Sequence, residues 1–370
     1  MKVLMLSTDE KVFESGSPVR ERMISYGTMV DELHIVVYTK RESRIQNLEF
    51  RIGRNVLIYS TNSACKFCYF LDAYKIAKKV ILDSNFYFLD SIITTQDPFE
   101  TGLLGYLLKK KFGLPLQIQI HTDFLSPYFW RESVKNKIRV LLAKRLIKKA
   151  DGLRVVSDRI KKSLHDSRFM IPDSRIAVLP IFFDKARFEQ AAARKEYNDD
   201  FLILTVARLE PEKNLFLALE AVAEVLREYP KTRYVIIGSG SLKNQLVDKI
   251  KSLDVSDRIE IKQVNTSDLP SWYKRANLFL LTSNYEGYGL AVVEAVASGL
   301  PVVMTDVGVA IGSVVPVDKA EPLVAALRKL IESPEERRLA VERQKQFFNN
   351  LPTKAEYLNQ MLESWQSCCS

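Results

Sequence analysis

Residues 278–306 read LFLLTSNYEGYGLAVVEAVASGLPVVMTD, and this stretch decides the fold class. The apolar run at its start has the composition of a buried strand, residues 289–298 have the composition of a helix, and PVVMTD from Pro301 is a second strand-like run. A strand, a helix and a strand in this order are typical of a parallel sheet. The stretch therefore predicts an α/β fold.

The same alternation extends to both ends of the chain. We expect two doubly wound sheets, because the strand pattern stops after Phe183 and starts again at Leu202. The expected strands begin at residues 2, 34, 55, 91, 116, 152 and 176, and then at 202, 233, 258, 278 and 301. After Glu321 only helical patterns remain, and the last is an amphipathic stretch through Tyr357, Met361 and Trp365.

The length supports two domains. A chain of 370 residues exceeds the roughly 250–300 residues at which one core stops growing. Residues 184–198 are polar and carry no strand pattern, so we expect the linker there. The domains are then 1–183, joined by about 352–370, and 199–351.

Composition limits the location and the partners. Four cysteines are too few for a disulfide framework and favour a reducing cytoplasm, and neither a signal peptide nor a membrane-spanning helix is expected. The pair Cys65 and Cys68 lacks the second ligand pair that a zinc site needs, since the nearest histidines, His34 and His121, lie in strand patterns. The net charge of +9 calls for a polyanion, which could be a nucleotide diphosphate, anionic lipid or nucleic acid.

Part of this charge lies in residues 135–149. Seven basic residues accompany apolar residues at helical spacing. Two interpretations stay open: a basic amphipathic helix that lies on an anionic membrane, or an ordinary helix with a solvated basic face. The basic residues are Lys135, Lys137, Arg139, Lys144, Arg145, Lys148 and Lys149, and the apolar ones are Ile138, Leu141, Leu142, Leu146 and Ile147.

Two cations follow the first strand of the second domain. Arg208 and Lys213 lie at the strand end and in the loop before the next helix. Parallel sheets bind phosphate at the carboxyl ends of their strands, and a guanidinium with an ammonium suits a diphosphate. A structural ion pair to Glu210 or Glu212 is the alternative explanation.

Two carboxylates follow a later strand. Glu286 lies in the loop and Glu294 on the following helix, and the glycines at 287 and 289 allow a ligand to approach the backbone. The first amides of that helix, near Leu290, would face an anion. Glu294 stands among apolar residues, where an ionised carboxylate needs a partner, and ribose hydroxyls would serve.

These motifs together resemble the donor domain of glycosyltransferase family 4, the group 1 glycosyltransferases. The resemblance covers Arg208 to Gly308 most clearly, with the cation pair, a GxG turn at Gly238–Gly240 and the Glu-x7-Glu element. It extends more thinly over the first domain, in TTQDPFETGLLG, in QIHTDF around His121, in ADGLRVVS and in VLPIFFD. It implies the GT-B architecture: two Rossmann-like domains that face each other across a cleft, with the C-terminal helix crossing back to the first.

The resemblance also implies roles for particular residues. Arg208 and Lys213 would hold the diphosphate, Glu294 the ribose, and Glu286 the donor sugar and distal phosphate. His121 would line the reaction centre, although a single histidine after a strand is more often a packed or capping residue. The other implied donor-binding residues are Gly16, Gly238, Val264, Gly287, Tyr288, Gly289 and Leu290.

The implied activity is transfer of a hexose from a UDP- or GDP-sugar to a hydroxyl of a glycan or lipid-linked acceptor, with retention and without metal or cofactor. Leaving-group stabilisation would then be the main catalytic contribution. One departure from the family concerns the loop after Gly308, which is short and has no acidic residue between Asp306 and Asp318.

Rival interpretations are a non-catalytic GT-B subunit, which loss of a cation or carboxylate would favour, and a sugar-nucleotide epimerase or a phosphorylase. The chain keeps both cations and both carboxylates described above. Neither rival enzyme fits its motifs. A nucleic-acid partner would fit the charge but not the two sheets, and none is expected.

Overall fold

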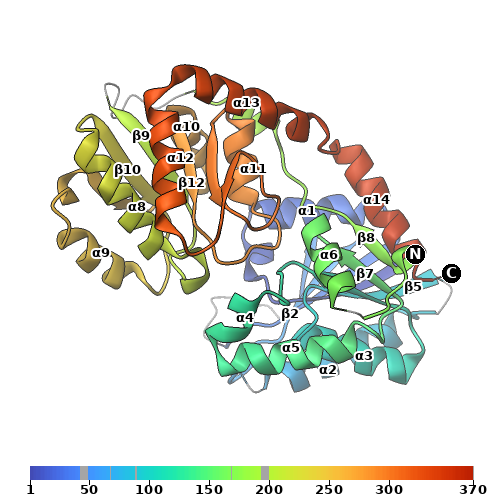
Figure 1. Ribbon diagram of the computed structural model, residues 1–370. Helices are drawn as coiled ribbons and strands as arrows, with labels where there is room; N and C mark the ends of the chain where they lie inside the picture. Colours follow the sequence, from blue (N-terminus) through green and yellow to red (C-terminus); the bar gives the residue numbers. More distant parts are fainter. Residues whose placement is uncertain (42–48, 67, 88–89, 168, 193–199, 370) are drawn as a thin grey trace. The chain divides into compact units, whose positions relative to one another are not determined.

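The computed structural model describes residues 1–41, 49–66, 68–87, 90–167, 169–192 and 200–369. Within it the chain forms two compact units, Met1–Phe182 with Pro352–Ser370, and Phe183–Leu351 (Figure 1). Each unit is built on its own parallel sheet.

The sheet of the first unit has eight strands in the order β3-β4-β2-β1-β5-β6-β7-β8. All neighbouring strands are parallel except β3, which pairs antiparallel with β4. The strands are β1 (Lys2–Ser7), β2 (Glu32–Val37), β3 (Glu49–Ile52), β4 (Val56–Ser60), β5 (Ser91–Thr95), β6 (Leu116–Ile120), β7 (Gly152–Val155) and β8 (Ile176–Val178). The helices are α1 (Pro18–Gly27), α2 (Tyr69–Asp83), α3 (Glu100–Phe112), α4 (Pro127–Glu132), α5 (Val134–Leu146) and α6 (Asp158–Asp166).

The C-terminal helix α14 (Lys354–Gln366) belongs to the first unit (Figure 1). Thr353 and Glu356 form a capping box at its start, which satisfies two of the amides that a helix N-terminus leaves unpaired. Trp365 is fully buried in the core of this unit, and the Tyr357 hydroxyl lies 2.5 Å from the Tyr26 hydroxyl of α1. The chain thus returns to its first domain at its end.

The sheet of the second unit has six strands in the order β11-β10-β9-β12-β13-β14, and all its pairs are parallel. The strands are β9 (Phe201–Val206), β10 (Thr232–Ile237), β11 (Ile259–Lys262), β12 (Leu278–Leu281), β13 (Val302–Thr305) and β14 (Ser313–Val315). The helices are α7 (Ala186–Glu189), α8 (Leu215–Glu228), α9 (Lys243–Lys251), α10 (Leu269–Arg275), α11 (Leu290–Ala297), α12 (Ala320–Glu332) and α13 (Pro334–Asn349).

Both faces of this second sheet are buried, as the continuous apolar runs require. Ile203 packs with α8 and α12 on one face, while Leu202 and Leu204 pack with α10 and α11 on the other. Alternate residues of a strand point to opposite faces, so one strand serves two separate cores.

Two short strands and one helix were not predicted. β3 and β14 lie at or near sheet edges and are four and three residues long, too short to give a periodic signal. Within the expected linker 184–198, Ala186–Glu189 forms α7, and Phe188 is 4% exposed in the second unit's core. This part of the expected linker therefore belongs to the second unit, and residues 193–199 lie outside the described residues.

Within the described part of the chain, no helix is both long and apolar enough to cross a membrane.

Candidate functional site

The order of strands changes direction between β9 and β12 in the second sheet. β9 pairs with β10 on one side and with β12 on the other, through Ile203 with Leu278 and Leu204 with Phe279. The helices that follow β9 and β12 therefore lie on opposite faces, and the loops at the two carboxyl ends diverge there. This is the position at which open sheets of this kind bind ligands.

Lys213 and Glu286 meet at this position. The Lys213 Nζ lies 2.6 Å from Glu286 Oε1, both side chains are 13% exposed, and the Ser283 hydroxyl donates to the same oxygen at 2.8 Å. Thr282 fixes the backbone by donating to the carbonyl of Lys213. The loop after β9 and the loop after β12 are thus joined by a largely buried ion pair.

Arg208 follows β9 in the chain and is much more exposed than Lys213. Its side chain is 73% exposed, and its Nη2 donates to Glu212 Oε1 at 2.5 Å. The alternative that the sequence left open, an ion pair with Glu212, is therefore present. The pair is exposed only on its Arg208 side, since the Glu212 side chain is 10% exposed, and most of the guanidinium therefore stays open to a ligand.

The helix α11 begins at the same end of the sheet. Gly289 precedes it with φ of 91°, a left-handed conformation that favours glycine. The first amides of a helix have no partner within it, so the backbone at Leu290 and Ala291 presents N–H donors and the positive end of the helix dipole.

Glu294 lies one turn further along α11. Its Oε2 accepts a hydrogen bond from the Tyr273 hydroxyl at 2.7 Å. Burial raises the pKa of Glu294 to about 7, against the opposing effects of Tyr273 and of Arg187 on α7. Its second oxygen has no hydrogen-bond partner among the described residues, so the carboxyl can still accept hydroxyl donors.

The GxG turn has a structural explanation of its own. A Cβ on Gly238 would lie 1.8 Å from the carbonyl oxygen of Ala207, and one on Gly240 2.5 Å from that of Leu209. The turns after β9 and β10 therefore touch through their backbones, and the glycines are required whether or not a ligand binds. The donor-binding role of Gly238 stays a prediction.

The short loop after β13 closes against the loop after β12. Val309 donates its amide to the carbonyl of Tyr288, and a Cβ on Gly308 would lie 2.5 Å from that carbonyl oxygen. Tyr288 is buried and Val264 half-buried on the core. Packing against the core explains the positions of both residues, and their predicted role in donor binding stays a prediction.

The first unit has a cavity at the corresponding position, where β1 lies between β2 and β5. Its volume is about 400 Å³, and it is bordered by residues at the carboxyl ends of β1, β5, β6 and β7 and by α1 and α14. The lining residues are Met5, Thr8, Asp9, Arg22, Met23, Tyr26, Gln96, Gln119, His121, Arg154, Ile181 and Tyr357.

His121 is the residue of this cavity that the sequence predicted. Its Nε2 lies 3.0 Å from Gln119 Oε1. Burial, with Arg154 and Arg22 nearby, holds the pKa of the imidazole well below its usual range, so His121 is neutral at pH 7. A neutral imidazole can donate at one nitrogen and accept at the other.

Gly16 precedes α1 at the same end of the first sheet. Its φ is 73°, and a Cβ there would meet no atom within 4 Å. The left-handed backbone favours glycine by itself, and the open space agrees with a ligand approaching the backbone.

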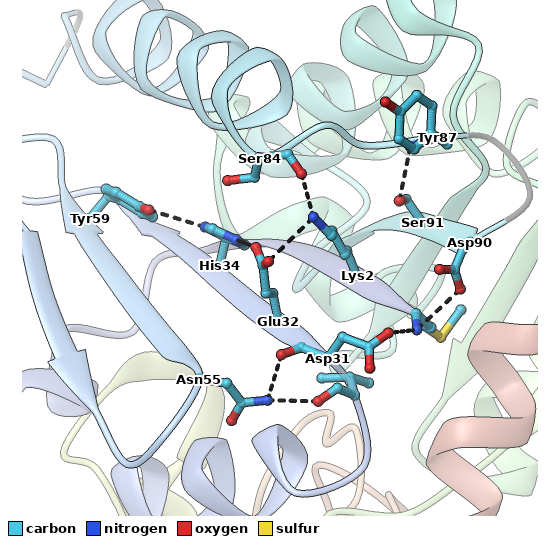
Figure 2. Close-up of polar contacts among 12 residues, drawn as sticks. Lys2, Asp31, Glu32, His34, Asn55, Tyr59, Ser84, Tyr87, Asp90 and Ser91 are labelled. Atoms are coloured by element: carbon cyan, nitrogen blue, oxygen red, sulfur yellow. Dashed lines mark hydrogen bonds and ion pairs between the residues drawn. The ribbon is translucent and has the colours of Figure 1, made fainter.

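His34 differs from His121 in having two partners (Figure 2). It is 2% exposed on β2, with Nδ1 3.0 Å from the Tyr59 hydroxyl and Nε2 2.8 Å from Glu32 Oε2. Glu32 is paired in turn with Lys2 at 3.2 Å. His34 is therefore a satisfied structural residue at the amino end of its strand.

Metal-binding chemistry finds no support in the described residues, where no three or more His, Cys, Asp and Glu side chains gather to hold an ion. Cys65 Sγ and Cys68 Sγ lie 2.9 Å apart, and both are free thiols.

The basic segment 135–149 forms α5 and the turn after it. α5 packs through Asn136, Val140, Ala143 and Leu146, whereas Ile138 and Leu141 are 62% and 49% exposed. The helix therefore has a buried stripe, as an ordinary packed helix does, while two of the apolar residues that the membrane interpretation invoked, Ile138 and Leu141, are exposed.

Sequence reasoning missed most of the cavity in the first unit. Arg22 and Arg154 come from a helix and from the middle of a strand, and Gln96 and Gln119 from strand ends. The polar residues in LQIQI, each 1–2% exposed, were the available signal, because a buried strand seldom carries them without a function.

Comparison with known proteins agrees with this geometry. Residues 186–347 match the family model "Glycosyl transferases group 1". Alpha-monoglucosyldiacylglycerol synthase of Acholeplasma laidlawii is 28% identical over 230 residues, which cover 58% of this chain and 58% of that protein. The chain thus spans little more than half the length of this relative.

Solved structures show the fold over the whole chain. Sucrose-phosphate synthase of Thermosynechococcus elongatus superposes with a TM-score of 0.81 at 16% identity, covering 98% of each chain. HepE of Anabaena, solved with UDP and glucose, gives a TM-score of 0.73 at 16% identity, covering 98% of this chain and 99% of its own. The predicted resemblance and the GT-B fold are both confirmed.

Proposed function

We propose that the chain transfers a hexose from a UDP- or GDP-sugar to a hydroxyl group of a glycan or lipid-linked acceptor, since residues 186–347 match the family model "Glycosyl transferases group 1". One observation carries the proposal: Lys213, Glu286 and the first amides of α11 converge where the strand order of the second sheet reverses. HepE was solved with UDP and glucose, which favours UDP as the nucleotide.

The chemistry rests on charge stabilisation. Breaking the bond from the anomeric carbon to the diphosphate places negative charge on the leaving oxygen, and Lys213, Arg208 and the α11 amides stabilise that charge. Glu294 accepts hydrogen bonds from the ribose hydroxyls, and Glu286 with the Gly287–Leu290 backbone binds the sugar. No metal or cofactor is part of the proposal.

We propose retention of configuration through attack on the face that the diphosphate leaves, which needs no nucleophile from the protein. His121 serves the acceptor side as a neutral hydrogen-bonding group. The alternative is a non-catalytic GT-B subunit, and it is the less favoured because Arg208, Lys213, Glu286 and Glu294 are all present.

Thermal shift with UDP, GDP, ADP and their sugars tests the donor. A ligand stabilises in proportion to the logarithm of its concentration over its dissociation constant, so one nucleotide should raise the melting temperature. Glu294→Ala should abolish the shift, and Lys251→Ala, an exposed lysine of the same unit, should keep it. The enzyme proposal fails if no nucleotide shifts the melting temperature and no UDP or GDP is released from any donor.

We also propose that the protein works in the cytoplasm, at the inner face of a membrane, through α4 and α5. Val134, Ile138 and Leu141 of α5 are 49–71% exposed and follow one another at spacings of four and three residues, which places them in one row of the helix. Trp130, at 37% exposure, lies on α4, just before the extended Ser133 that separates the two helices. Segment 134–149 contains no acidic residue. Within the described part of the chain, four of its cations form no ion pair, namely Lys137, Lys144, Arg145 and Lys149. An apolar row flanked by cations suits an anionic lipid surface.

Flotation with vesicles tests this part separately. The protein should float with vesicles that contain phosphatidylglycerol at low salt and less with purely zwitterionic vesicles. Ile138→Glu should reduce binding, while Leu82→Glu, which changes an equally exposed leucine at the end of α2, should not. Equal flotation of the two variants would count against the surface.

A further inference from the structure

The cavity of the first unit carries more positive than negative charge. Two guanidinium groups, Arg22 and Arg154, and one carboxylate, Asp9, line its 400 Å³, while His121 is neutral. The Asp9 carboxylate already accepts the amide of Lys11, at the start of a short 3-10 helix.

The hydrogen bonds of Arg154 all go to neutral acceptors. It is 3% exposed and donates to Gln119 Oε1 at 2.7 Å, to the carbonyls of Leu179 and Pro180, and to the Tyr357 hydroxyl at 3.1 Å. None of these acceptors is a carboxylate. Arg154 therefore fixes the wall of the cavity and leaves its charge without a counter-ion.

Arg22 has a different position. It lies in the middle of α1 with a half-buried side chain that lines the cavity. No hydrogen bond or ion pair joins it to the residues that the structure describes, whereas Arg20, two residues earlier, is held by the carbonyl of Phe13. A partly desolvated guanidinium without a partner is a strong site for a planar or tetrahedral oxyanion.

We propose that Arg22 binds an oxyanion of the acceptor, a phosphate ester or a carboxylate, and holds the accepting hydroxyl near His121. The proposal rests on the proposed function and narrows its acceptor to an anionic compound. Arg154 adds to the favourable potential without contacting the acceptor, and Gln96 and Thr8 supply neutral polar groups at the same strand ends.

Matched acceptors test the proposal with the full chain and the donor that the thermal-shift panel identifies. Transfer is measured to glycerol and glycerol 1-phosphate, to glucose and glucuronate, and to vesicles that contain diacylglycerol or phosphatidylglycerol. We expect the anionic member of at least one pair to be preferred. Arg22→Met should raise its KM by about 10- to 100-fold, the value of a lost charge-assisted hydrogen bond, with little change for the neutral member.

Two variants control for charge and folding. Arg22→Lys keeps the charge and should recover part of the affinity for the anionic acceptor. Arg54→Met removes an exposed cation of the same unit outside the cavity and should change no KM. Melting temperatures confirm that each variant folds.

The outcomes separate this inference from the function on which it rests. Comparing transfer to the water-soluble acceptors with transfer to the vesicles shows whether the anion belongs to a small phosphorylated or acidic compound or to a lipid. If Arg22→Met weakens transfer to neutral and anionic acceptors equally, or weakens nucleotide binding, the inference is overturned while the glycosyltransferase stands. If the parent protein itself releases no nucleotide from any donor, the proposed function fails instead.

Discussion

The carboxyl ends of the two sheets offer the same topological position, but their cations differ in whether a carboxylate pairs with them. In the second unit each cation meets a carboxylate, Arg208 with Glu212 and Lys213 with Glu286. In the first unit Arg22 and Arg154 line a cavity without pairing to a carboxylate among the described residues. Both cations of the second site are thus already paired, and under the proposed function a diphosphate would compete with Glu286 for Lys213. The first site holds positive charge that no carboxylate among the described residues pairs with.

The largest effect is expected from breaking the Lys213–Glu286 pair. Lys213→Ala should lower kcat about 100-fold or more, since it removes a charge that stabilises the leaving group. Glu286 keeps its hydrogen bond from Ser283 but loses its counter-ion at a site that is 13% exposed, so the free energy of unfolding should also fall, by about 1–3 kcal/mol. The kcat is therefore measured at a temperature at which the parent and the variant are both folded. Steady-state nucleotide release, with Lys251→Ala as control, measures this, and an undiminished kcat would exclude the assigned role.

Two glycines of the second unit differ in whether a neighbouring backbone leaves room for a side chain. Gly238→Ala places a Cβ 1.8 Å from the Ala207 carbonyl oxygen and should lower the free energy of unfolding by about 3 kcal/mol. Gly299→Ala has a positive φ of 80° but open space, so it should cost only about 1 kcal/mol. Urea denaturation compares the two, and equal costs would contradict the backbone contact.

Burial of the Glu294 carboxyl makes the stability of the second unit depend on pH. Its pKa is about 7 in the folded protein and about 4.3 unfolded, so the ionised carboxylate opposes folding fully above pH 7, and the cost disappears as pH falls toward 4. Glu294→Gln should therefore melt higher than the parent at pH 8, by roughly 5–10 °C, since such a pKa difference corresponds to about 3 kcal/mol. The gap should narrow below pH 7 and close near pH 4. Its affinity for UDP should fall about 10-fold. A gap independent of pH would refute the shifted pKa.

The smallest effect is expected at the exposed pair. Arg208→Gln should change the unfolding free energy by about 1 kcal/mol or less, because the guanidinium is 73% exposed and the glutamine amide can still donate to the buried Glu212 carboxylate. Its kcat should fall, but less than that of Lys213→Ala, because the guanidinium is 73% exposed and less firmly placed. If Arg208→Gln proves the more damaging change, the ranking of the two cations is wrong.

The sequence predicted the second unit better than the first. In the second unit the functional candidates are charged residues in loops that follow apolar strands, and charge after a strand is easy to recognise. In the first unit Arg154 lies within a strand and Arg22 within a helix. Only burial and the missing partner set them apart from ordinary arginines, and neither property can be read from local composition.

The sequence by itself determined the two α/β sheets, the residues at the strand ends and the likeness to group 1 glycosyltransferases, because these depend on the local alternation of apolar and polar residues and on short motifs. Only the tertiary structure decided that β12 lies beside β9. The return of α14 to the first unit was implied by the family resemblance and not by any local pattern. Strand order joins residues more than 70 positions apart, such as Lys213 and Glu286. No local pattern encodes which strand a given strand will pair with, since that choice depends on the packing of helices on both faces.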